Sequence, residues 1–431
     1  MLTRIPKGTK DVLPTESPRL QAIEALMREK ARLAGYAEIR TPVFEHTELF
    51  ARAAGETSDV VRKEMYTFKD KGDRSITLKP ESTAGVVRAF IESGLYAQAL
   101  PLKVYYLSAP HFRYEAPQAG RLREHHQFGM ECFGAQQASA DAELILTAVD
   151  VLSSLGLKGV ALRINSIGCP NCRPAYQEKL REFLHGKADK LCKDCVERTE
   201  TNPLRVLDCK NPECQKELVD APRMLDYLCD ECQDHFEDLK RFLEAADIDF
   251  VVDTGIVRGL DYYTKTVFEL TTDTPTGTMT ACGGGRYDKL VEQVGGPSIP
   301  AVGFGMGIER VVMLLDQLSP EDQKLTVLSN APDVFVASLN KALAVNAFDL
   351  MLGFRKRGLK ADMDHAARSL KAQFKYADKL GAAYMAILGD DEIAKGVVKL
   401  RNMNTKEEWE VTIASAPDAL QKLIHKSAEE E

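Results

Sequence analysis

Five apolar residues near the start of the chain recur every three or four positions, as residues on one face of a helix do. They are Leu20, Ile23, Met27, Ala31 and Ala34. Residues 39–44 follow as a short apolar stretch that is broken by Pro42, and they predict a strand at the edge of a sheet. The chain is therefore expected to begin with a long amphipathic helix that leads into an edge strand.

Four later stretches are rich in aromatic and β-forming residues and lie between turn-forming positions. They are residues 102–107, 126–133, 267–271 and 277–281. This composition favours the strands of a largely antiparallel sheet. The larger, N-terminal part of the chain is therefore predicted to be an α+β domain.

Composition changes between residues 168 and 250, where eight of the ten cysteines fall, glycine becomes rare and helix-forming residues dominate. This segment is predicted to be an inserted helical module. The predicted order along the chain is residues 1–167 and 251–320 for two parts of one core, 168–250 for the insertion, and 330–424 for a C-terminal α/β domain.

The C-terminal α/β domain is predicted from strands that alternate with helices. A polar link that contains proline follows Leu318. After it, residues 334–339 and 384–388 resemble strands, and residues 342–357 and 366–379 resemble helices.

Length and charge exclude several classes of protein. A chain of 431 residues that is 44% hydrophobic forms two or three domains with proper cores. No apolar run is long enough to cross a bilayer, and the start of the chain lacks the apolar core of a signal peptide, so a cytoplasmic protein without a membrane partner is expected. In that compartment ten cysteines indicate metal binding or buried thiols rather than disulfides.

The net charge is −8, from 56 lysines and arginines against 64 acidic residues. Such a chain does not bind nucleic acid indiscriminately, and no DNA partner is expected. A nucleic-acid contact must use a local patch. Residues 354–379 are one candidate because they contain eight lysines and arginines and three aspartates. A solvated helix face is the alternative explanation for this basic segment.

Arginines and glycines gather in four segments. Residues 109–134 contain Arg113, Arg121 and Arg123 between two predicted strands, and arginine suits the planar, delocalised oxygens of a phosphate. Residues 301–318 place three glycines before a helix that has Arg310 in its first turn, where unpaired backbone amides also favour an anion.

The other two segments are VRGLDYYT at residues 257–264 and ACGGGRYD at 281–288. They add two arginines, three tyrosines and a triple glycine. Together the four segments place six arginines, glycine-rich backbone and aromatic hydroxyls in what is predicted to be one polar pocket.

These segments, with three others, resemble the bacterial type of the histidyl-tRNA synthetase family, a class II family, over essentially the whole chain. The matching motifs are KGTKDVLP at 7–14, TPVFEHTELF at 41–50, LKPESTAGVVRA at 78–89, FRYE at 112–115, RGLDYYT at 258–264, GGGRYD at 283–288 and GFGMGIER at 303–310. RGLDYYT and GGGRYD resemble the two signatures that separate this family from other class II synthetases.

The resemblance implies a six-stranded antiparallel class II catalytic core, a helical insertion and a C-terminal α/β anticodon-binding domain. It also implies a homodimer that is built partly through the first motif. The implied activity is that of a histidine–tRNA ligase in translation, which uses ATP with Mg²⁺. The carboxylate of L-histidine attacks the α-phosphate of ATP, and the terminal ribose of tRNA(His) then accepts the histidyl group. Both steps depend on charge and position rather than on a covalent enzyme intermediate.

The resemblance also implies roles for individual residues. Arg113 and Arg258 are the implied catalytic residues. ATP is bound by Arg113, Glu115, Arg121 and Arg310. Histidine is bound by Glu81, Ser82, Thr83, Arg113, Gln127, Glu131, Arg258, Tyr262 and Tyr263, and Tyr287 shapes the pocket. In this arrangement Glu131 and Tyr263 pair with the two imidazole nitrogens, which discriminates strongly against amino acids that cannot make both bonds.

Four positions depart from the family's usual pattern. Lys79 stands where arginine is usual, Ser82 where glycine is usual, Ala116 where arginine is common, and Leu122 where an aromatic residue is common. We expect altered affinities rather than lost activity, because the residues to which the resemblance gives chemical roles are all present.

The cysteines of the predicted insertion form four closely spaced pairs, and nothing in the resemblance implies a metal there. The pairs are Cys169 and Cys172, Cys192 and Cys195, Cys209 and Cys214, and Cys229 and Cys232. Eight thiolates in such pairs suit two tetrahedral, structural Zn²⁺ sites. The alternative is a set of small buried hydrophobic residues.

The remaining cysteines, Cys132 and Cys282, are predicted to be thiols in the pocket wall. His125 and His126 are predicted to lie on a surface loop.

Two other functions are weighed against the ligase. A regulatory subunit related to the synthetases, which partners a phosphoribosyltransferase and does not charge tRNA, usually lacks the C-terminal domain and parts of the histidine signatures. The second alternative is a zinc-dependent RNA-binding or structural protein that uses the cysteine module and the basic segment. This function is disfavoured because it gives no role to the arginines that suit phosphate.

Overall fold

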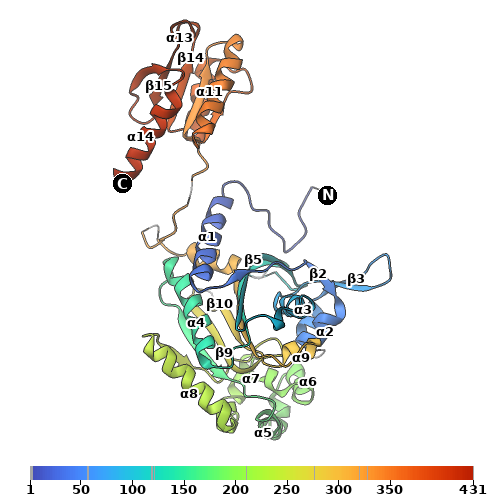
Figure 1. The fold of residues 1–431 in the computed structure, drawn as a ribbon. Helices are drawn as coiled ribbons and strands as arrows, with labels where there is room; N and C mark the ends of the chain where they lie inside the picture. The colour runs from blue at the N-terminus through green and yellow to red at the C-terminus, as the bar shows by residue number, and fades with distance from the viewer. Residues whose placement is uncertain are drawn as a thin grey trace. The chain divides into compact units, whose positions relative to one another are not determined.

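The computed structural model describes residues 3–55, 58–117, 120, 122–209, 211–275, 277–319, 321–327 and 329–430. The chain folds into two compact units, Met1–Val327 and Leu328–Glu431 (Figure 1). The predicted division of the first unit into a core and an insertion at residues 168–250 stays a prediction. In the described part of the chain, no helix has both the length and the apolar character needed to cross a membrane.

The first unit is built on a sheet of eight strands, which lie in the order β1-β5-β6-β11-β10-β9-β7-β8. Their bounds are β1 (Ala37–Glu38), β5 (Leu102–Phe112), β6 (Glu124–Phe133), β7 (Ala161–Ser166), β8 (Phe250–Val252), β9 (Thr264–Thr274), β10 (Gly277–Arg286) and β11 (Ala301–Gly307). The six strands from β5 to β7 in this order pair antiparallel, and β1 and β8 add parallel edges. The implied α+β class II core with six antiparallel strands is therefore confirmed.

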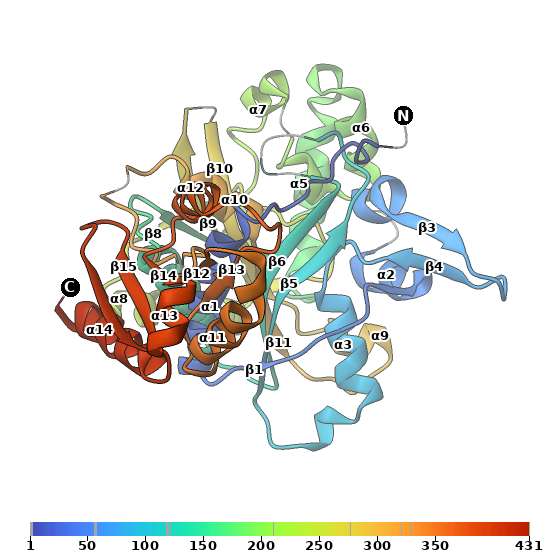
Figure 2. The ribbon, with the colours of Figure 1, turned by 90° about the horizontal axis from the view of Figure 1, so that it is seen from above.

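Helices cover both faces of this sheet (Figure 2). One face packs against α1 (Ser17–Leu33), α4 (Ala138–Ser154), α8 (Asp230–Ala245) and α10 (Ile308–Leu315). The other face packs against α2 (Thr47–Ala54), α3 (Thr83–Glu92) and α9 (Leu290–Val294). The buried side chains Ile23, Met27 and Ala31 confirm the apolar face predicted for the first helix.

The strand predicted at residues 39–44 is wrong, because of these residues only Phe44 lies in a strand. The chain forms β1, leaves the large sheet, and enters a second sheet of three strands, which are β2 (Phe44–His46), β3 (Tyr66–Lys69) and β4 (Ser75–Leu78). Pro42 lies between the two sheets, where its missing N–H leaves no ladder bond unmade. The residues predicted to be one strand are thus mostly the connection between two sheets.

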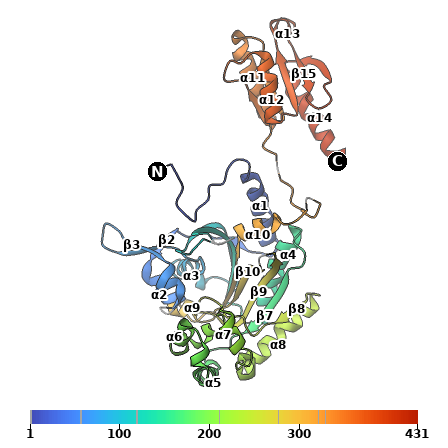
Figure 3. The same cartoon turned by 180° about the vertical axis from the view of Figure 1, so that it is seen from behind.

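The cysteine-rich segment is helical, as its composition predicts, and lies beside the β7 edge of the sheet (Figure 3). Its helices before α8 are α5 (Arg173–His185), α6 (Lys193–Thr201) and α7 (Pro212–Glu217). Short turns of helix join them at η3 (Ala188–Lys190), η4 (Pro203–Val206) and η5 (Met224–Tyr227). Elsewhere in the first unit are η1 (Val60–Glu64) and η2 (Leu95–Ala97).

The second unit has a five-stranded sheet in the order β13-β12-β14-β15-β16. The strands are β12 (Val334–Ser338), β13 (Ala361–Met363), β14 (Tyr384–Leu388), β15 (Val397–Asn402) and β16 (Glu408–Thr412). The helices are η6 (Lys341–Leu343), α11 (Ala344–Lys356), α12 (Leu370–Leu380), α13 (Asp390–Lys395) and α14 (Ala416–Glu430). The predicted α/β character is confirmed, although the second predicted helix begins later than expected, at Leu370.

Candidate active site and cysteine clusters

A row of glycines crosses three strands of the large sheet and forms the floor of a cavity. Gly129 of β6 pairs with Gly305 of β11, which in turn pairs with Gly283 of β10. Because side chains alternate along a strand, Gln127 and Glu131 of β6 emerge on the same face as Gly129. The absence of side chains in this row opens a space above the sheet, which is a cavity of about 90 Å³.

Glycine is required here because charged side chains lie directly above the backbone. A Cβ atom at Gly303 would lie 1.6 Å from Oε2 of Glu131, and one at Gly283 would lie 2.5 Å from Nη1 of Arg258. The triple glycine is therefore part of strand β10. Its Gly283 makes room for the side chain of Arg258, and Gly303 of β11 makes room for that of Glu131.

Eight of the nine residues predicted to bind histidine line this cavity. They are Glu81, Thr83, Arg113, Gln127, Glu131, Arg258, Tyr262 and Tyr263. The ninth, Ser82, shares a hydrogen bond of 2.8 Å with Nε2 of His111 and is not part of the cavity wall. Tyr287 also lines the cavity, as predicted.

Tyr106 of β5 is a lining residue that the sequence analysis missed. Its ring lies over the glycine floor, where a Cβ atom at Gly129 would be 2.2 Å from it. A glycine that faces an aromatic residue on the neighbouring strand is the signal that identifies it, but the signal is readable only once the strand register is known.

Glu131 is buried at the base of the cavity and is held by two hydroxyls. Thr83 Oγ1 donates to Oε1 at 2.8 Å, and the Tyr287 hydroxyl donates to Oε2 at 2.5 Å. Burial raises the pKa of Glu131 to about 8, against the lowering effect of these two hydrogen bonds. A carboxyl group that is buried and oriented in this way is suited to form a hydrogen bond with a polar atom of a ligand.

Glu81 lies at the N-terminus of α3. Its two oxygens accept hydrogen bonds from the backbone N–H groups of Thr83, at 2.6 Å, and Ala84, at 2.8 Å. These bonds satisfy donors that a helix start leaves unpaired. Burial nevertheless raises the pKa of the Glu81 carboxyl. The cavity therefore has a second buried carboxyl group beside Glu131.

Arg113 and Arg258 bring positive charge to the same cavity from segments next to two different strands, β5 and β9. Arg113 follows β5, and its Nε donates to the carbonyl of Pro80 at 2.9 Å. Arg258 precedes β9, and its Nη1 lies 2.5 Å from Oε1 of Glu269. Two guanidinium groups beside two carboxyl groups suit a zwitterionic ligand that bears an additional anion.

Of the residues predicted to bind ATP, Glu115 and Arg310 do not line this cavity. Nη1 of Arg310, in the first turn of α10, donates to the carbonyl of Thr280 at 2.6 Å. Glu115 follows β5, and its carbonyl accepts from Nε of Arg123 at 3.2 Å. Arg121 lies outside the described residues. Arg123 also stacks on the ring of Tyr114, 4.2 Å from its centre.

The prediction that six arginines share one pocket is wrong. Of those described, Arg113 and Arg258 line the cavity, whereas Arg123 and Arg310 do not. Arg286 is not in the cavity wall either. Its side chain is fully buried and forms an ion pair with Asp141 of α4. Although burial alone would raise it, the pKa of Asp141 is lowered to about 2 by Arg286 and His235. Arg286 therefore anchors a helix to the sheet.

The two histidines predicted on a surface loop belong to strand β6 instead. Nδ1 of His126 lies 2.8 Å from Oε1 of Glu309, which raises the pKa of this imidazole. His125 stacks on His111, with ring centres 5.3 Å apart, and burial lowers its pKa to about 4. The carboxylate partner of His126 is far away in the sequence, so no local pattern points to it.

Cys132 and Cys282 do not line the cavity, contrary to prediction. Both are buried in the apolar core that faces α1 and α4. Cys132 follows Glu131 on β6, and the alternation of a strand turns it to the other face of the sheet.

Of the four departures from the family pattern, Lys79 and Ser82 are buried. Burial lowers the pKa of the Lys79 ammonium group. Ala116 is exposed and Leu122 is partly exposed, beside the undescribed residues 118, 119 and 121.

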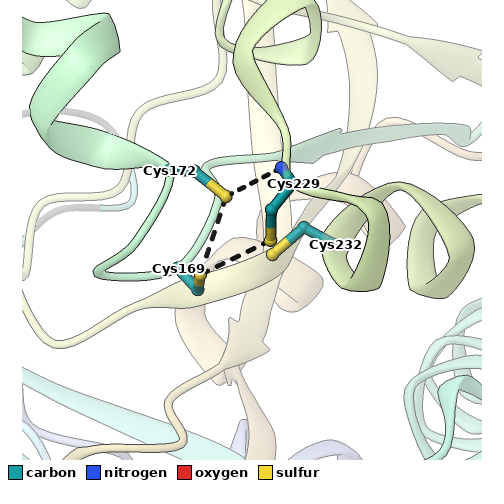
Figure 4. Close-up of side chains that lie close together, drawn as sticks. All are labelled: Cys169, Cys172, Cys229 and Cys232. Carbon is teal, nitrogen blue, oxygen red and sulfur yellow. Dashed lines mark hydrogen bonds between the residues drawn. The ribbon is translucent and has the colours of Figure 1, made fainter.

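The eight cysteines of the helical segment form two separate clusters of four. Cys169, Cys172, Cys229 and Cys232 make the first, and Cys192, Cys195, Cys209 and Cys214 make the second. Within each cluster the sulfur atoms lie within 4.8 Å of one another (Figure 4 shows the first). The first cluster joins the two ends of the segment, and the second lies between them in the sequence. We call them the outer and the inner cluster.

Comparison with known proteins agrees with this geometry. The sequence model of the family described as "Histidyl-tRNA synthetase" matches residues 8–311. The chain belongs to the histidyl-tRNA synthetase family. A second model, described as "Anticodon binding domain", matches residues 333–423, which fall in the second unit.

Curated relatives resemble the chain over its whole length. The "Histidine--tRNA ligase" of Caldanaerobacter subterraneus subsp. tengcongensis is 54% identical over 98% of this chain and 100% of its own. That of Alkaliphilus oremlandii is 54% identical over 96% of this chain and 97% of its own. The crystal structure of apo S. aureus histidyl-tRNA synthetase superimposes with a TM-score of 0.82 at 38% identity, over 97% of this chain and 99% of that one. The chain thus contains both the part that matches the family's own model and the part that matches the anticodon-binding model.

Proposed function

We propose that this chain is an ATP-dependent histidine–tRNA ligase. It joins L-histidine to ATP as histidyl-adenylate with release of pyrophosphate. It then transfers the histidyl group to the terminal ribose of tRNA(His) with release of AMP. The observation that carries the proposal is the cavity in which Glu131, Tyr263, Arg113 and Arg258 meet on the glycine face of the sheet.

Histidine recognition rests on groups at the two sides of this cavity. Glu131 and Tyr263 pair with the two imidazole nitrogens, while Glu81, Thr83 and Gln127 hold the α-ammonium group. Support comes from the burial of Glu131 and from its fixed bonds to Thr83 and Tyr287, which orient the carboxyl group before a ligand arrives. An amino acid without two ring nitrogens would leave these buried groups unpaired, and that penalty gives the selectivity.

Activation depends on placing positive charge where the carboxylate of histidine meets the α-phosphate. Arg113 and Arg258 supply this charge, and they stabilise the transition state more than the separate reactants. Glu269, which pairs with Arg258, and the carbonyl of Pro80, which accepts from Arg113, hold the two guanidinium groups in place.

ATP with Mg²⁺ is the proposed cofactor. Arg310 and Arg121 bind the outer phosphates, and Glu115 lies beside the adenine in this proposal. The position of Arg310 in the first turn of α10 supports the assignment, because the unpaired N–H groups of a helix start also favour an anion. Bound Mg²⁺ would neutralise charge on the phosphates.

The second unit is the proposed site of tRNA(His) recognition. The basic segment of residues 354–379 runs from the end of α11 to the end of α12. Arg355, Lys356 and Arg357 are exposed there. On a chain of net charge −8, a local basic patch of this kind supplies the positive charge that contacts with RNA phosphates need.

A homodimer is proposed through the first motif. Val43 and Phe44 of this motif are 40% and 51% exposed, and Phe68 on the same three-stranded sheet is 48% exposed. Apolar side chains gathered on one small sheet favour an interface with a second copy. Residence in the cytoplasm stays a prediction.

We propose that each of the two cysteine clusters binds one Zn²⁺ ion. A tetrahedral site with Zn–S bonds of about 2.3 Å has sulfur atoms about 3.8 Å apart. The distances are 3.6 Å between Cys169 and Cys172, 3.9 Å between Cys169 and Cys229, and 3.9 Å between Cys192 and Cys209. Four sulfur ligands leave no open position, so the metal's role is structural.

The regulatory subunit is the weaker alternative. Relatives of that kind usually lack the anticodon-binding domain and parts of the histidine signatures. This chain carries both a match to the anticodon-binding model and the residues Arg258, Tyr262 and Tyr263 in its cavity.

ATP–pyrophosphate exchange with each standard amino acid tests the proposal. Exchange that depends on histidine alone is expected. Folded protein that supports no exchange with any amino acid would move the assignment to the regulatory subunit.

A further inference from the structure

The segment that carries Arg258 has little regular structure of its own. Residues 253–263 join β8 to β9 without a helix or strand, yet they contribute Arg258, Tyr262 and Tyr263 to the cavity. A backbone hydrogen bond from Asp261 to the carbonyl of Ala54, at 3.3 Å, ties the segment to α2. Asn165 of β7 donates to the carbonyls of Thr254 and Ile256 at the start of the segment, and the cysteine-rich helices support the part that reaches the cavity.

The outer cluster supports the end of this segment. Cys172 is followed by Arg173, whose guanidinium donates to the carbonyl of Tyr263 through Nη2 and to that of Ile167 through Nε, at 3.2 Å. The backbone N–H of Lys265 donates to the carbonyl of Gly168 at 2.9 Å, directly before Cys169.

A third link joins the outer cluster to Lys265. The ammonium group of Lys265 lies 2.6 Å from Oε1 of Glu231, which stands between Cys229 and Cys232. Both cysteine pairs of the outer cluster are therefore connected to residues 263–265.

The inner cluster supports the start of the segment. The chain between Cys195 and Cys209 turns back through η4, where Nη1 of Arg205 donates to the carbonyl of Arg258 at 3.2 Å. Nδ2 of Asn202 donates to Oδ1 of Asp261 at 2.9 Å.

Arg205 is itself held from a second side. Its Nη2 donates to Oδ2 of Asp59 at 3.1 Å, and Arg198 donates to the same oxygen at 3.2 Å. The guanidinium of Arg205 thus joins the side chain of Asp59, which precedes η1, to the backbone carbonyl of Arg258, a proposed catalytic residue.

We propose that the two metal-binding cysteine clusters position the catalytic segment of residues 258–265 through Arg205 and Arg173. This inference rests on the proposed ligase function and on metal in the clusters. Arg205 and Arg173 are positioning residues, since each donates to a backbone carbonyl of the segment and acts on the reaction through Arg258 and Tyr263.

The physical reason lies in the size of the cysteine-rich segment. Its helices are short, from 6 residues in α7 to 16 in α8, and such short helices are marginal without packing or cross-links. Metal bound by four thiolates fixes chain ends that would otherwise be free to move, because the binding free energy of the metal adds to the folding free energy. Loss of either metal should therefore release the arginine that lies beside that cluster.

The test compares Arg205→Ala with wild-type enzyme in three measurements, which are zinc content, hydrogen exchange of the backbone amides, and histidine-dependent ATP–pyrophosphate exchange. The variant should keep two zinc ions per chain, because Arg205 is not a ligand. Its amides at residues 258–265 should exchange faster, and kcat/KM for histidine should fall about tenfold or more. Arg205→Lys, which retains a donor, should recover part of the loss. Arg223→Ala, at an exposed arginine of the same segment, is the control.

A second variant, in which Cys192 and Cys195 are both changed to serine, tests the metal link. It should lose one zinc ion and gain amide exchange at residues 195–209 and 258–261. Unchanged protection of residues 258–261 after loss of that zinc, or unchanged kcat/KM and amide exchange in both Arg205→Ala and Arg173→Ala, would overturn the inference. Wild-type protein that does not activate histidine would instead overturn the proposed function, while zinc content and amide exchange still decide the positioning.

Discussion

The hydroxyl of Tyr287 donates a hydrogen bond of 2.5 Å to Oε2 of Glu131, across strand β11, which lies between β10 and β6. With Thr83 on the other carboxyl oxygen, both oxygens of Glu131 have fixed donors. Tyr287 comes from the GGGRYD motif and Thr83 from LKPESTAGVVRA, so Glu131 of β6 joins two of the motifs that mark the family. The carboxyl group is thereby oriented for one side of an imidazole ring.

The first prediction concerns Glu131→Gln. Burial raises the pKa of Glu131 to about 8, whereas an exposed glutamate has a value of 4.5. The folded protein therefore holds a proton that the unfolded chain releases, and wild-type stability should fall as the pH rises from about 4.5 to about 8. The glutamine variant lacks this dependence.

Thermal denaturation of the ligand-free proteins between pH 5 and pH 8.5 measures the effect. The Tm of Glu131→Gln relative to wild type should increase with pH. Parallel Tm curves for the two proteins would show that the carboxyl group titrates near its ordinary pKa. The same variant should lose histidine activation by a factor of about 100 or more, because an amide nitrogen cannot accept the hydrogen bond that Thr83 or Tyr287 donates, and the group loses its fixed orientation toward the ring.

The second prediction concerns Arg258→Ala. If the guanidinium stabilises mainly the transition state, kcat for adenylate formation should fall by about 10²- to 10³-fold while the affinity for ATP changes little. Single-turnover kinetics and ATP binding at equilibrium separate the two effects. Arg401→Ala is a control, because Arg401 also pairs with an acidic residue, Glu408, but belongs to the second unit. Wild-type turnover in Arg258→Ala would remove Arg258 from the catalytic residues.

The third prediction concerns the metal. Wild-type protein produced with added zinc should contain two zinc ions per chain by native mass spectrometry. Replacing Cys169 and Cys172 with serine should leave one, and it should lower the Tm because the metal contributes folding free energy. Cys132→Ala, at a buried cysteine outside both clusters, should retain two zinc ions. Wild-type protein without bound metal would favour the alternative of plain buried thiols.

The fourth prediction concerns the dimer. Phe44→Glu places a charge in the proposed interface, which should shift the protein from dimer to monomer in sedimentation velocity. Phe242→Glu, at a similarly exposed phenylalanine on α8, should leave the dimer intact. A dimer of unchanged stability in Phe44→Glu would place the interface elsewhere.

Much of the fold follows from local sequence patterns. The strand at Tyr384–Leu388 matches its prediction residue for residue, because an apolar run of this length between helices is too short for a helix and suits a buried strand. The cavity residues were found through motifs, since each motif supplies a few polar side chains that the sheet brings together. Ser82 differs because its hydroxyl turns to His111, whose burial no local pattern reveals.

Long-range pairing is what the sequence could not supply. The four cysteine pairs are evident from their spacing, but which pair joins which depends on how the helices pack. The partners of Arg286 and His126 are 145 and 183 residues away. The sequence alone favours a solvated position or a place in the pocket for each of these side chains, because burying a charge is costly without a partner. The partner that offsets this cost becomes visible only in the folded chain.

The last prediction concerns tRNA. Changing Arg355, Lys356 and Arg357 to glutamine should weaken binding of tRNA(His) and reduce its dependence on salt. Each phosphate contact contributes just under one unit to the slope of log K against log salt concentration, so the slope should fall by up to about two to three. Arg357 also forms an ion pair with Asp418, and its loss leaves an uncompensated negative charge that should repel the RNA further. Histidine activation without tRNA should be unaffected. Lys341, Lys395 and Lys406, three exposed lysines elsewhere in the second unit, give a control with the same change of charge. If both triple variants weaken binding equally, the second unit contributes only its general charge and residues 354–379 are not the specific contact.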